Sequence, residues 1–164
     1  MLAQNILGFY DPMLVQTMYI FKSPKIGGEV NPHQDSTYIK STPLSCKAFW
    51  IAIDDATTEN GCMWGIPGSH KTTPIDYYMK ATRKDVFDDS GQFMGKESEV
   101  RYEPENPPKY TIQNQVPLDV KKGSVVMFDG AFVHFSDHNY SDKTRHAFTM
   151  HIVESKNTTW DEGS

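Results

Sequence analysis

A histidine and an aspartate two residues apart, His33 and Asp35, are the residues of this sequence best placed to bind a metal ion. Side chains on an extended strand alternate between faces, so these two share a face and Gln34 points to the other. Two residues span roughly 7 Å along a strand, which lets an imidazole and a carboxylate reach one ion. With one further histidine they would form a 2-His-1-carboxylate site, whose open coordination positions suit non-heme Fe(II). Alone, the pair is unspecific, because His-x-Asp is common by chance.

A third ligand must come from elsewhere in the chain, and His134 has the strongest case among the other histidines. It ends an apolar run, so we expect it to be anchored on a rigid element near the core. His138 lies in a polar turn, which favours a solvated position, and His70 follows the turn 67–69, where it could cap or brace that loop. His146 and His151 lie on the last predicted strand.

Arg145 is the second feature that points to chemistry, and two interpretations of it remain open. On a strand over 144–153, alternation places Arg145 on the less apolar face, which would leave it in solvent. Alternatively it lies inside the domain, where its guanidinium would bind a small-molecule carboxylate through two parallel hydrogen bonds. Ser136 would share the face of His134 and offer a hydroxyl to that carboxylate. An iron site beside a carboxylate clamp is what 2-oxoglutarate requires, because one end chelates the metal and the other needs a cation.

The elements that must position these residues are short strands separated by turn signals. The sequence predicts one domain over 1–164 that is an all-β sandwich or barrel of jelly-roll type, with almost no helix. The polar segment 71–109 shows little periodicity, so we expect an inserted loop and a candidate substrate lid there. Residues 1–12 are expected to form a loop. The predicted strands are 14–21, 29–35, 47–53, 62–66, 116–120, 123–128, 131–135 and 144–153.

Composition excludes several classes of function. The formal net charge of −5, without a basic stripe, argues against nucleic acid or an anionic membrane surface as partner. No apolar run is long enough to cross a bilayer, and the first residues lack the features of a signal peptide. Cys46 and Cys62 are expected to be buried free thiols in a reducing compartment, which favours a cytoplasmic protein over a secreted one. Nothing in the sequence supports a peroxisomal location or indicates an oligomeric state.

Taken in order, the motifs resemble the phytanoyl-CoA dioxygenase family of Fe(II)/2-oxoglutarate oxygenases. The likeness covers nearly the whole chain except 71–109. The matching segments are 18–22, 27–35, 50–56, 59–64, 67–70 and 133–145.

This resemblance implies a double-stranded β-helix, a jelly-roll or cupin-like core, and an enzyme that uses Fe(II), 2-oxoglutarate and O₂, with ascorbate in support. It implies oxidative decarboxylation of 2-oxoglutarate to succinate and CO₂, coupled to hydroxylation of a small-molecule substrate. Asp35 favours hydroxylation, because related halogenases carry a small residue in place of the carboxylate. The implied iron ligands are His33, Asp35 and His134, and the implied 2-oxoglutarate contacts are Met18, Gln34, Trp50, Ser136 and Arg145.

The sequence departs from the family pattern in one respect, and three other functions remain possible interpretations. Family members carry a further N-terminal region, so this chain could instead be a truncated, inactive binding module of the same family. A cupin-type metal enzyme that works without 2-oxoglutarate would need no arginine clamp, which makes Arg145 the deciding residue. A purely structural β-sandwich would carry these motifs only by coincidence. The substrate is not indicated, because no basic phosphate-binding cluster calls for an acyl-CoA.

Overall fold

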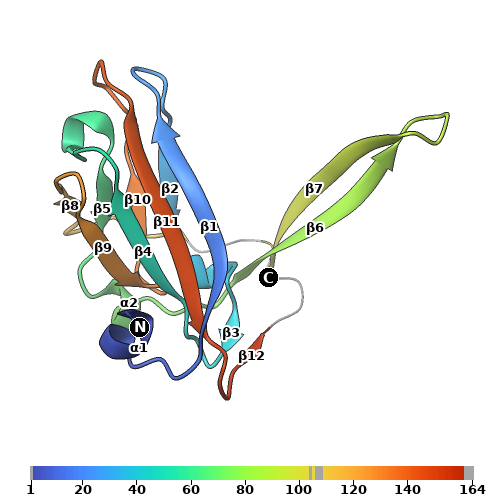
Figure 1. Cartoon of the computed structure of the whole chain (residues 1–164), viewed down its shortest axis with the longest axis horizontal. Coiled ribbons are helices and arrows are strands. Elements are labelled where there is room, and N and C mark those ends of the chain that lie inside the picture. The colour runs from blue at the N-terminus through green and yellow to red at the C-terminus, as the bar shows by residue number, and fades with distance from the viewer. Residues whose placement is uncertain (1, 104, 106–108, 161–164) are drawn as a thin grey trace.

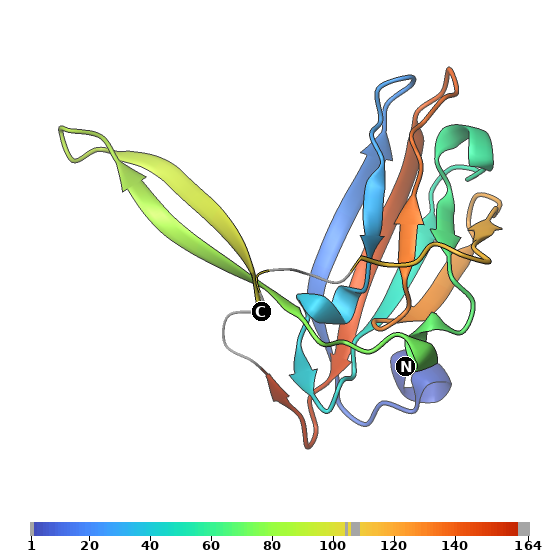
Figure 2. The same cartoon turned by 180° about the vertical axis from the view of Figure 1, so that it is seen from behind.

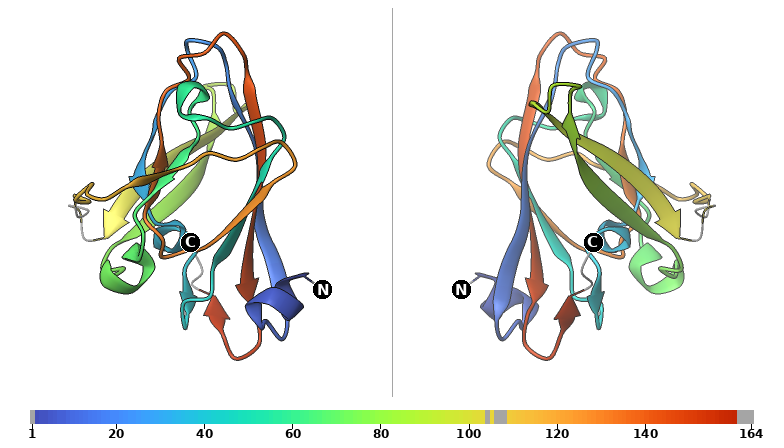
Figure 3. Two further views of the ribbon diagram at one scale, coloured as in Figure 1. Left: turned by 90° about the vertical axis from the view of Figure 1, so that its left-hand side faces the viewer. Right: turned by 90° about the vertical axis from the view of Figure 1, so that its right-hand side faces the viewer.

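The chain folds into two four-stranded antiparallel sheets that face each other. The computed structural model describes residues 2–103, 105 and 109–160, with the backbone alone for residues 2, 80–84, 96–100 and 160. Viewed from the sides, the sheets stack as two layers (Figure 3). The larger sheet has the order β1 (Pro12–Lys22), β11 (Arg145–Glu154), β4 (Lys47–Ala52), β9 (Val125–Asp129), and the smaller one β2 (Val30–His33), β10 (His134–Ser136), β5 (Met63–Gly65), β8 (Val116–Leu118).

Strands that are neighbours in these sheets are far apart in the sequence, as a jelly-roll requires (Figures 1 and 2). The predicted all-β jelly-roll core is therefore confirmed. The two strands on either side of Asn60-Gly61, β4 and β5, lie in different sheets. A 3-10 turn, η2 (Thr58–Asn60), ends there at Gly61, whose left-handed conformation (φ 77°) leads the chain across.

The ends and connections contain the little helix there is. Helix α1 (Leu2–Leu7) occupies part of the segment predicted as a loop, so that prediction is wrong there. Helix α2 (Ser69–Thr72) and the 3-10 turn η1 (Asp35–Thr37) are single turns. None of the described helices has the length and apolar content to cross a bilayer. Among the described residues, two further sheets have two strands each, and one of them pairs β3 (Ser41–Thr42) with β12 (Thr159–Trp160).

Most of the segment predicted as a loop over 71–109 forms a long antiparallel hairpin instead. Its strands are β6 (Tyr78–Phe87) and β7 (Phe93–Glu103), and it projects away from the two sheets (Figure 1). The loop prediction failed because a hairpin in solvent needs no apolar face, so its strands lack the alternation that marks a half-buried strand.

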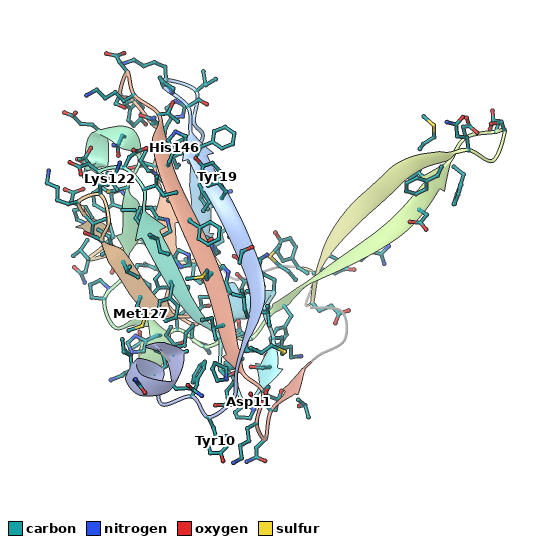
Figure 4. All side chains as sticks on the ribbon, viewed as in Figure 1. Tyr10, Asp11, Tyr19, Lys122, Met127 and His146 are labelled. Atoms are coloured by element: carbon teal, nitrogen blue, oxygen red, sulfur yellow. The ribbon has the colours of Figure 1, made fainter. Side chains whose placement is uncertain are left out.

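Alternation along β11 decides the position of Arg145. Its inward side chains are buried at every second position from Arg145 to Val153, and the outward ones are half-buried. On the outer face Tyr19 Oη lies 2.5 Å from His146 Nδ1 (Figure 4). The prediction that Arg145 lies inside the domain is thus confirmed. The alternative, which placed it in solvent, was wrong because the outer face of β11 is the more apolar of the two.

The hydrophobic core lies between the two sheets. Trp50, Ala52, Cys62, Met63 and Ala147 are at its centre. Both cysteines are buried and free, as predicted, and burial raises the pKa of the Cys62 thiol to about 12.

Gly130 fixes the corner between β9 and β10, behind the start of η1. Its N–H donates to Cys46 O at 2.8 Å and its carbonyl accepts from Ser36 N at 2.9 Å. A Cβ at this position would lie 2.4 Å from Ser36 Oγ and 3.0 Å from Cys46 O. The corner therefore has no space for a side chain.

We expect Gly130→Ala to lower the free energy of unfolding by about 1–3 kcal/mol, because overpacking forces the backbone to shift. Denaturant unfolding measures the change. Gly28→Ala is the matched control, since nothing lies within 4 Å of its added Cβ. Equal stability of the two variants would contradict the packing described for Gly130.

Candidate active site

Strand pairing brings the two candidate histidine ligands together. His33 on β2 and His134 on β10 are directly opposite partners in the smaller sheet, so their side chains share a face. Their ring centroids are 4.2 Å apart. The two histidines are far apart in the sequence, and the antiparallel register of β2 and β10 brings them side by side.

Backbone carbonyls fix which nitrogen of each histidine faces the site. His33 Nδ1 lies 2.7 Å from Asn31 O, and His134 Nδ1 lies 3.0 Å from Phe132 O. A carbonyl oxygen can only accept a hydrogen bond, so each Nδ1 carries a proton, and Nε2 is the nitrogen left to bind a metal when the ring is neutral. Both Nε2 atoms face Asp35 Oδ1, at 3.5 Å from His33 and 3.7 Å from His134.

Asp35 reaches this point from the first residue of η1, not from a strand as predicted. The backbone remains extended through Gln34 (φ −123°, ψ 127°), so alternation still turns Asp35 to the side of His33. The carboxylate is 2% exposed. Burial acts to raise the pKa of Asp35, but hydrogen bonds with His151 and His33 hold it well below its usual range, so the group is ionised.

The three groups form a site that calls for a cation. Two imidazole Nε2 atoms and a carboxylate oxygen point toward one another, with all ligand atoms within 4.8 Å. Burial lowers the pKa of His134 to about 4 despite the nearby charge of Asp35, so this ring does not supply the cation by taking a proton. Burial also acts to lower the pKa of His33, but its hydrogen bonds with Asp35 and Asn31 raise it above the ordinary value. The donor set fits a divalent metal such as Fe(II).

Arg145 lies at the inner end of the same site with most of its hydrogen-bonding capacity unused. It is 1% exposed, and its NH2 donates to Gly61 O. Nε and NH1 are buried and have no partner among the described residues. The guanidinium lies over Trp50, 5.4 Å from the ring centroid. Burial lowers the pKa of Arg145 to about 10, so the group stays charged at neutral pH and is poised for an anion.

A cavity of about 730 Å³ joins the three candidate metal ligands to Arg145. Met18, Trp50 and Ser136 also line it. Met18 and Trp50 flank Thr149 on neighbouring strands of the larger sheet, and Ser136 is two residues beyond His134. Four of the five residues implied as 2-oxoglutarate contacts therefore face one cavity with the three candidate ligands.

Gln34 is the exception among the implied contacts. Its side chain is fully buried and does not line the cavity. The amide nitrogen donates to Ala131 O at 2.6 Å and to Thr73 O at 3.2 Å, and Tyr110 Oη donates to its Oε1 at 3.0 Å. In this structure Gln34 braces the wall of the site, and its role as a cosubstrate contact stays a prediction.

Sequence reasoning missed two residues of the inner face of β11. Thr149 and His151 are buried, line the cavity and belong to the same alternating row as Arg145. That row was visible in the sequence, but a threonine and a second histidine on it were not recognised as site residues. Of the other histidines, His70 is exposed on α2 and His138 Nε2 bonds to a carbonyl of the 25–28 turn.

The family model described as Phytanoyl-CoA dioxygenase (PhyH) matches residues 2–147. The chain belongs to the phytanoyl-CoA dioxygenase family. Among curated members of this family, phytanoyl-CoA dioxygenase domain-containing protein 1 of Danio rerio is 44% identical over 162 residues, covering 96% of this chain and 52% of the relative. The phytanoyl-CoA dioxygenase of Arabidopsis thaliana is 38% identical over 154 residues, covering 94% and 49%. The chain thus spans about half the length of the curated phytanoyl-CoA dioxygenase relatives it matches.

Solved structures share the fold of this phytanoyl-CoA dioxygenase family chain. The non-heme alpha ketoglutarate dependent carbocyclase SnoK from nogalamycin biosynthesis matches with a TM-score of 0.66 at 26% identity, covering 98% of this chain and 56% of SnoK. EvdO2 from Micromonospora carbonacea var. aurantiaca, solved in complex with 2-oxoglutarate, matches with a TM-score of 0.63 at 19% identity, covering 92% and 54%. The second likeness concerns the fold alone.

We expect Fe(II) or Mn(II) to raise the melting temperature of the chain, because the folded state alone assembles the three ligands. At a metal concentration 100-fold above Kd the shift should be roughly 5–10 °C. His134→Ala should abolish it, and His70→Ala, which changes an exposed histidine, should retain it. Thermal unfolding under anaerobic conditions measures both. A shift that survives in His134→Ala would remove this histidine from the metal site.

Proposed function

We propose that this chain carries the active site of an Fe(II)- and 2-oxoglutarate-dependent oxygenase that hydroxylates a small-molecule substrate. The observation that carries the proposal is the pairing of two features in one cavity. One is the convergence of His33, Asp35 and His134, and the other is the buried guanidinium of Arg145 with Nε and NH1 unpaired. 2-Oxoglutarate has a carboxylate at one end, which Arg145 would bind, and an oxo acid at the other end, which would chelate the metal. The two features of the cavity therefore match the two ends of this molecule.

In this proposal the residues of the chain bind and orient the cosubstrate. Arg145 would take the far carboxylate through two parallel hydrogen bonds from its unpaired N–H groups, with Ser136 as a further donor. Trp50, which is buried beneath the guanidinium, would shield that charge pair from water, and Met18 lines the same cavity. A bound ferrous ion would supply the oxygen chemistry that converts 2-oxoglutarate to succinate and CO₂. One atom of O₂ would enter succinate, and the other would enter the hydroxyl of the product.

The outer part of the cavity is the place we assign to the substrate. The base of the β6–β7 hairpin and the segment after it contribute Tyr77, Met79, Tyr102 and Tyr110 to the lining. Tyr77 and Tyr110 are joined by a hydrogen bond of 2.6 Å between their hydroxyls. The hairpin base rather than its projecting tip would therefore act as the lid predicted for this segment.

The alternative is a binding module of the same family, which would hold the metal and 2-oxoglutarate without turnover. Succinate formation from 2-oxoglutarate, Fe(II) and O₂ in the presence of ascorbate separates the two. We expect succinate release above background from this chain or from a longer chain that spans the length of its relatives. His33→Ala and Asp35→Ala should abolish the release. Metal and 2-oxoglutarate binding without succinate in either chain would support the binding module.

Arg145→Ala should weaken 2-oxoglutarate binding by about 2–4 kcal/mol, because one partner of a buried charge pair is lost. In Kd this is about a 30-fold to several-hundred-fold change. Titration calorimetry on the Mn(II)-loaded chain measures it. Lys143→Ala, which removes an exposed cation just before β11, should leave Kd unchanged, and Arg145→Lys tests the fork geometry if the alanine variant does not fold. Unaltered affinity in both Arg145 variants would take this residue out of the site.

Lys22 gives the binding a predicted pH dependence. It is the strand partner of Arg145, and its Nζ donates to the carbonyls of Gly28 and Asp137. Burial, and then the charge of Arg145, lower the pKa of Lys22 to about 8. An anion held by Arg145 would offset that charge, so the complex would hold the Lys22 proton more tightly than the free chain does.

By linkage, 2-oxoglutarate affinity should be constant below about pH 8 and fall as the pH rises through about 8. Lys22→Met should flatten this part of the profile, and the exposed Lys25→Met should not. Calorimetric titrations at several pH values measure the slope. An identical slope in the wild type and Lys22→Met would show that Lys22 is not coupled to the anion.

A further inference from the structure

The imidazole of His151 makes its polar contact with a metal ligand and not with the metal position. It is on the inner face of β11, six residues beyond Arg145 in the same alternating row, and is 2% exposed. Its Nε2 lies 3.1 Å from Asp35 Oδ2. Its Nδ1 has no partner among the described residues. The hydrogen bond to Asp35 is therefore its one polar interaction in the described part of the chain.

The two oxygens of Asp35 have separate neighbours. Oδ1 faces Nε2 of both His33 and His134 and also accepts a hydrogen bond of 3.1 Å from Tyr38 Oη. Oδ2 faces His151. An ionised carboxylate can only accept, so His151 Nε2 must be the donor. That hydrogen bond uses one of the two acceptor positions of Oδ2 and ties this oxygen to β11.

We propose that His151 is a positioning residue that restricts Asp35 to one coordinating oxygen. This inference rests on the proposed function, because it concerns the carboxylate of the same metal site. A donor bonded to Oδ2 holds the carboxylate plane and leaves Oδ1 as the oxygen directed between His33 and His134. Outer hydrogen bonds of this kind set the orientation and the basicity of metal ligands.

Binding of Asp35 through one oxygen would leave more coordination positions of the metal free. An octahedral ion with two imidazoles and one carboxylate oxygen has three positions left, two for the oxo acid and one for O₂. If Asp35 bound through both oxygens, the oxo acid would fill the two remaining positions and O₂ would have none. The hydrogen bond from His151 therefore preserves the position on which the oxygen chemistry depends.

His151 is not itself placed as a fourth ligand. The set of ligand atoms within 4.8 Å of one another, among the described residues, comprises His33, Asp35 and His134 and leaves His151 out. Its nitrogen approaches the oxygen of Asp35 that does not face those two rings. The site therefore differs from metal sites in which a further histidine binds the metal directly.

The test compares His151 variants that differ in reach and in donor capacity. His151→Gln places an amide N–H near the position of Nε2, His151→Asn is equally polar but too short, and His151→Leu fills the space without a donor. His146→Leu is the matched control, because His146 is on the same strand but on the outer face, bonded to Tyr19. The readouts are Co(II) affinity by calorimetry and the visible ligand-field spectrum of the Co(II)-loaded chain, both independent of turnover.

We expect His151→Leu and His151→Asn to lose about 10- to 100-fold in Co(II) affinity and to change the spectrum, as a second carboxylate oxygen enters. His151→Gln should stay within a few-fold of the wild type with an unchanged spectrum, as should His146→Leu. If His151→Leu does not fold, the Asn and Gln pair carries the comparison.

Three results would overturn the inference, and they are distinguishable from one another. Wild-type affinity and spectrum in His151→Leu or His151→Asn would show that Oδ2 needs no donor. Equal losses in His151→Gln and His151→Asn would show that shape, not the donated hydrogen bond, matters. Absence of Co(II) binding by the wild type would instead overturn the proposed function, and the inference with it.

Discussion

The site depends on one electrostatic constraint, which is that three electron-pair donors are buried facing one another. The carbonyls of Asn31 and Phe132 hold the imidazoles of His33 and His134 with their Nε2 lone pairs toward Asp35. Burying such a cluster is costly unless a positive charge offsets it. The positions that the backbone imposes on the two rings therefore favour a bound cation, in addition to the identity of the three residues.

The two sheets divide the chemistry between them. The smaller sheet supplies both histidines through a single pair of opposed residues, and the larger sheet supplies the inner face of β11 with Arg145, Thr149 and His151. The distance between the cluster of His33, Asp35 and His134 and the guanidinium of Arg145 is consequently set by how the sheets stack. The alternation of β11 sets which groups enter the cavity, and both sheets line that cavity.

Much of the site could be predicted from the sequence because strand alternation is a local rule. His33 and Asp35 share a side since the chain stays extended between them, even though Asp35 begins a 3-10 turn. The position of Arg145 could not be decided from polarity, because the outer face of β11 is apolar and half-exposed. The hairpin over 78–103 was missed because its sequence shows no regular alternation of apolar and polar residues. The role of His151 depends on a contact with Asp35 across the fold, which no local pattern contains.

The most direct measurement of the central claim is the coupling between metal and cosubstrate. 2-Oxoglutarate would be titrated into the metal-free and the Mn(II)-loaded chain, and Mn(II) into the chain with and without 2-oxoglutarate. If the candidate metal ligands and Arg145 bind the same 2-oxoglutarate molecule, Mn(II) should raise the affinity for 2-oxoglutarate by at least about tenfold. 2-Oxoglutarate should raise the affinity for Mn(II) by the same factor, because linkage requires the two factors to be equal. Equal 2-oxoglutarate affinities with and without Mn(II) would contradict the account.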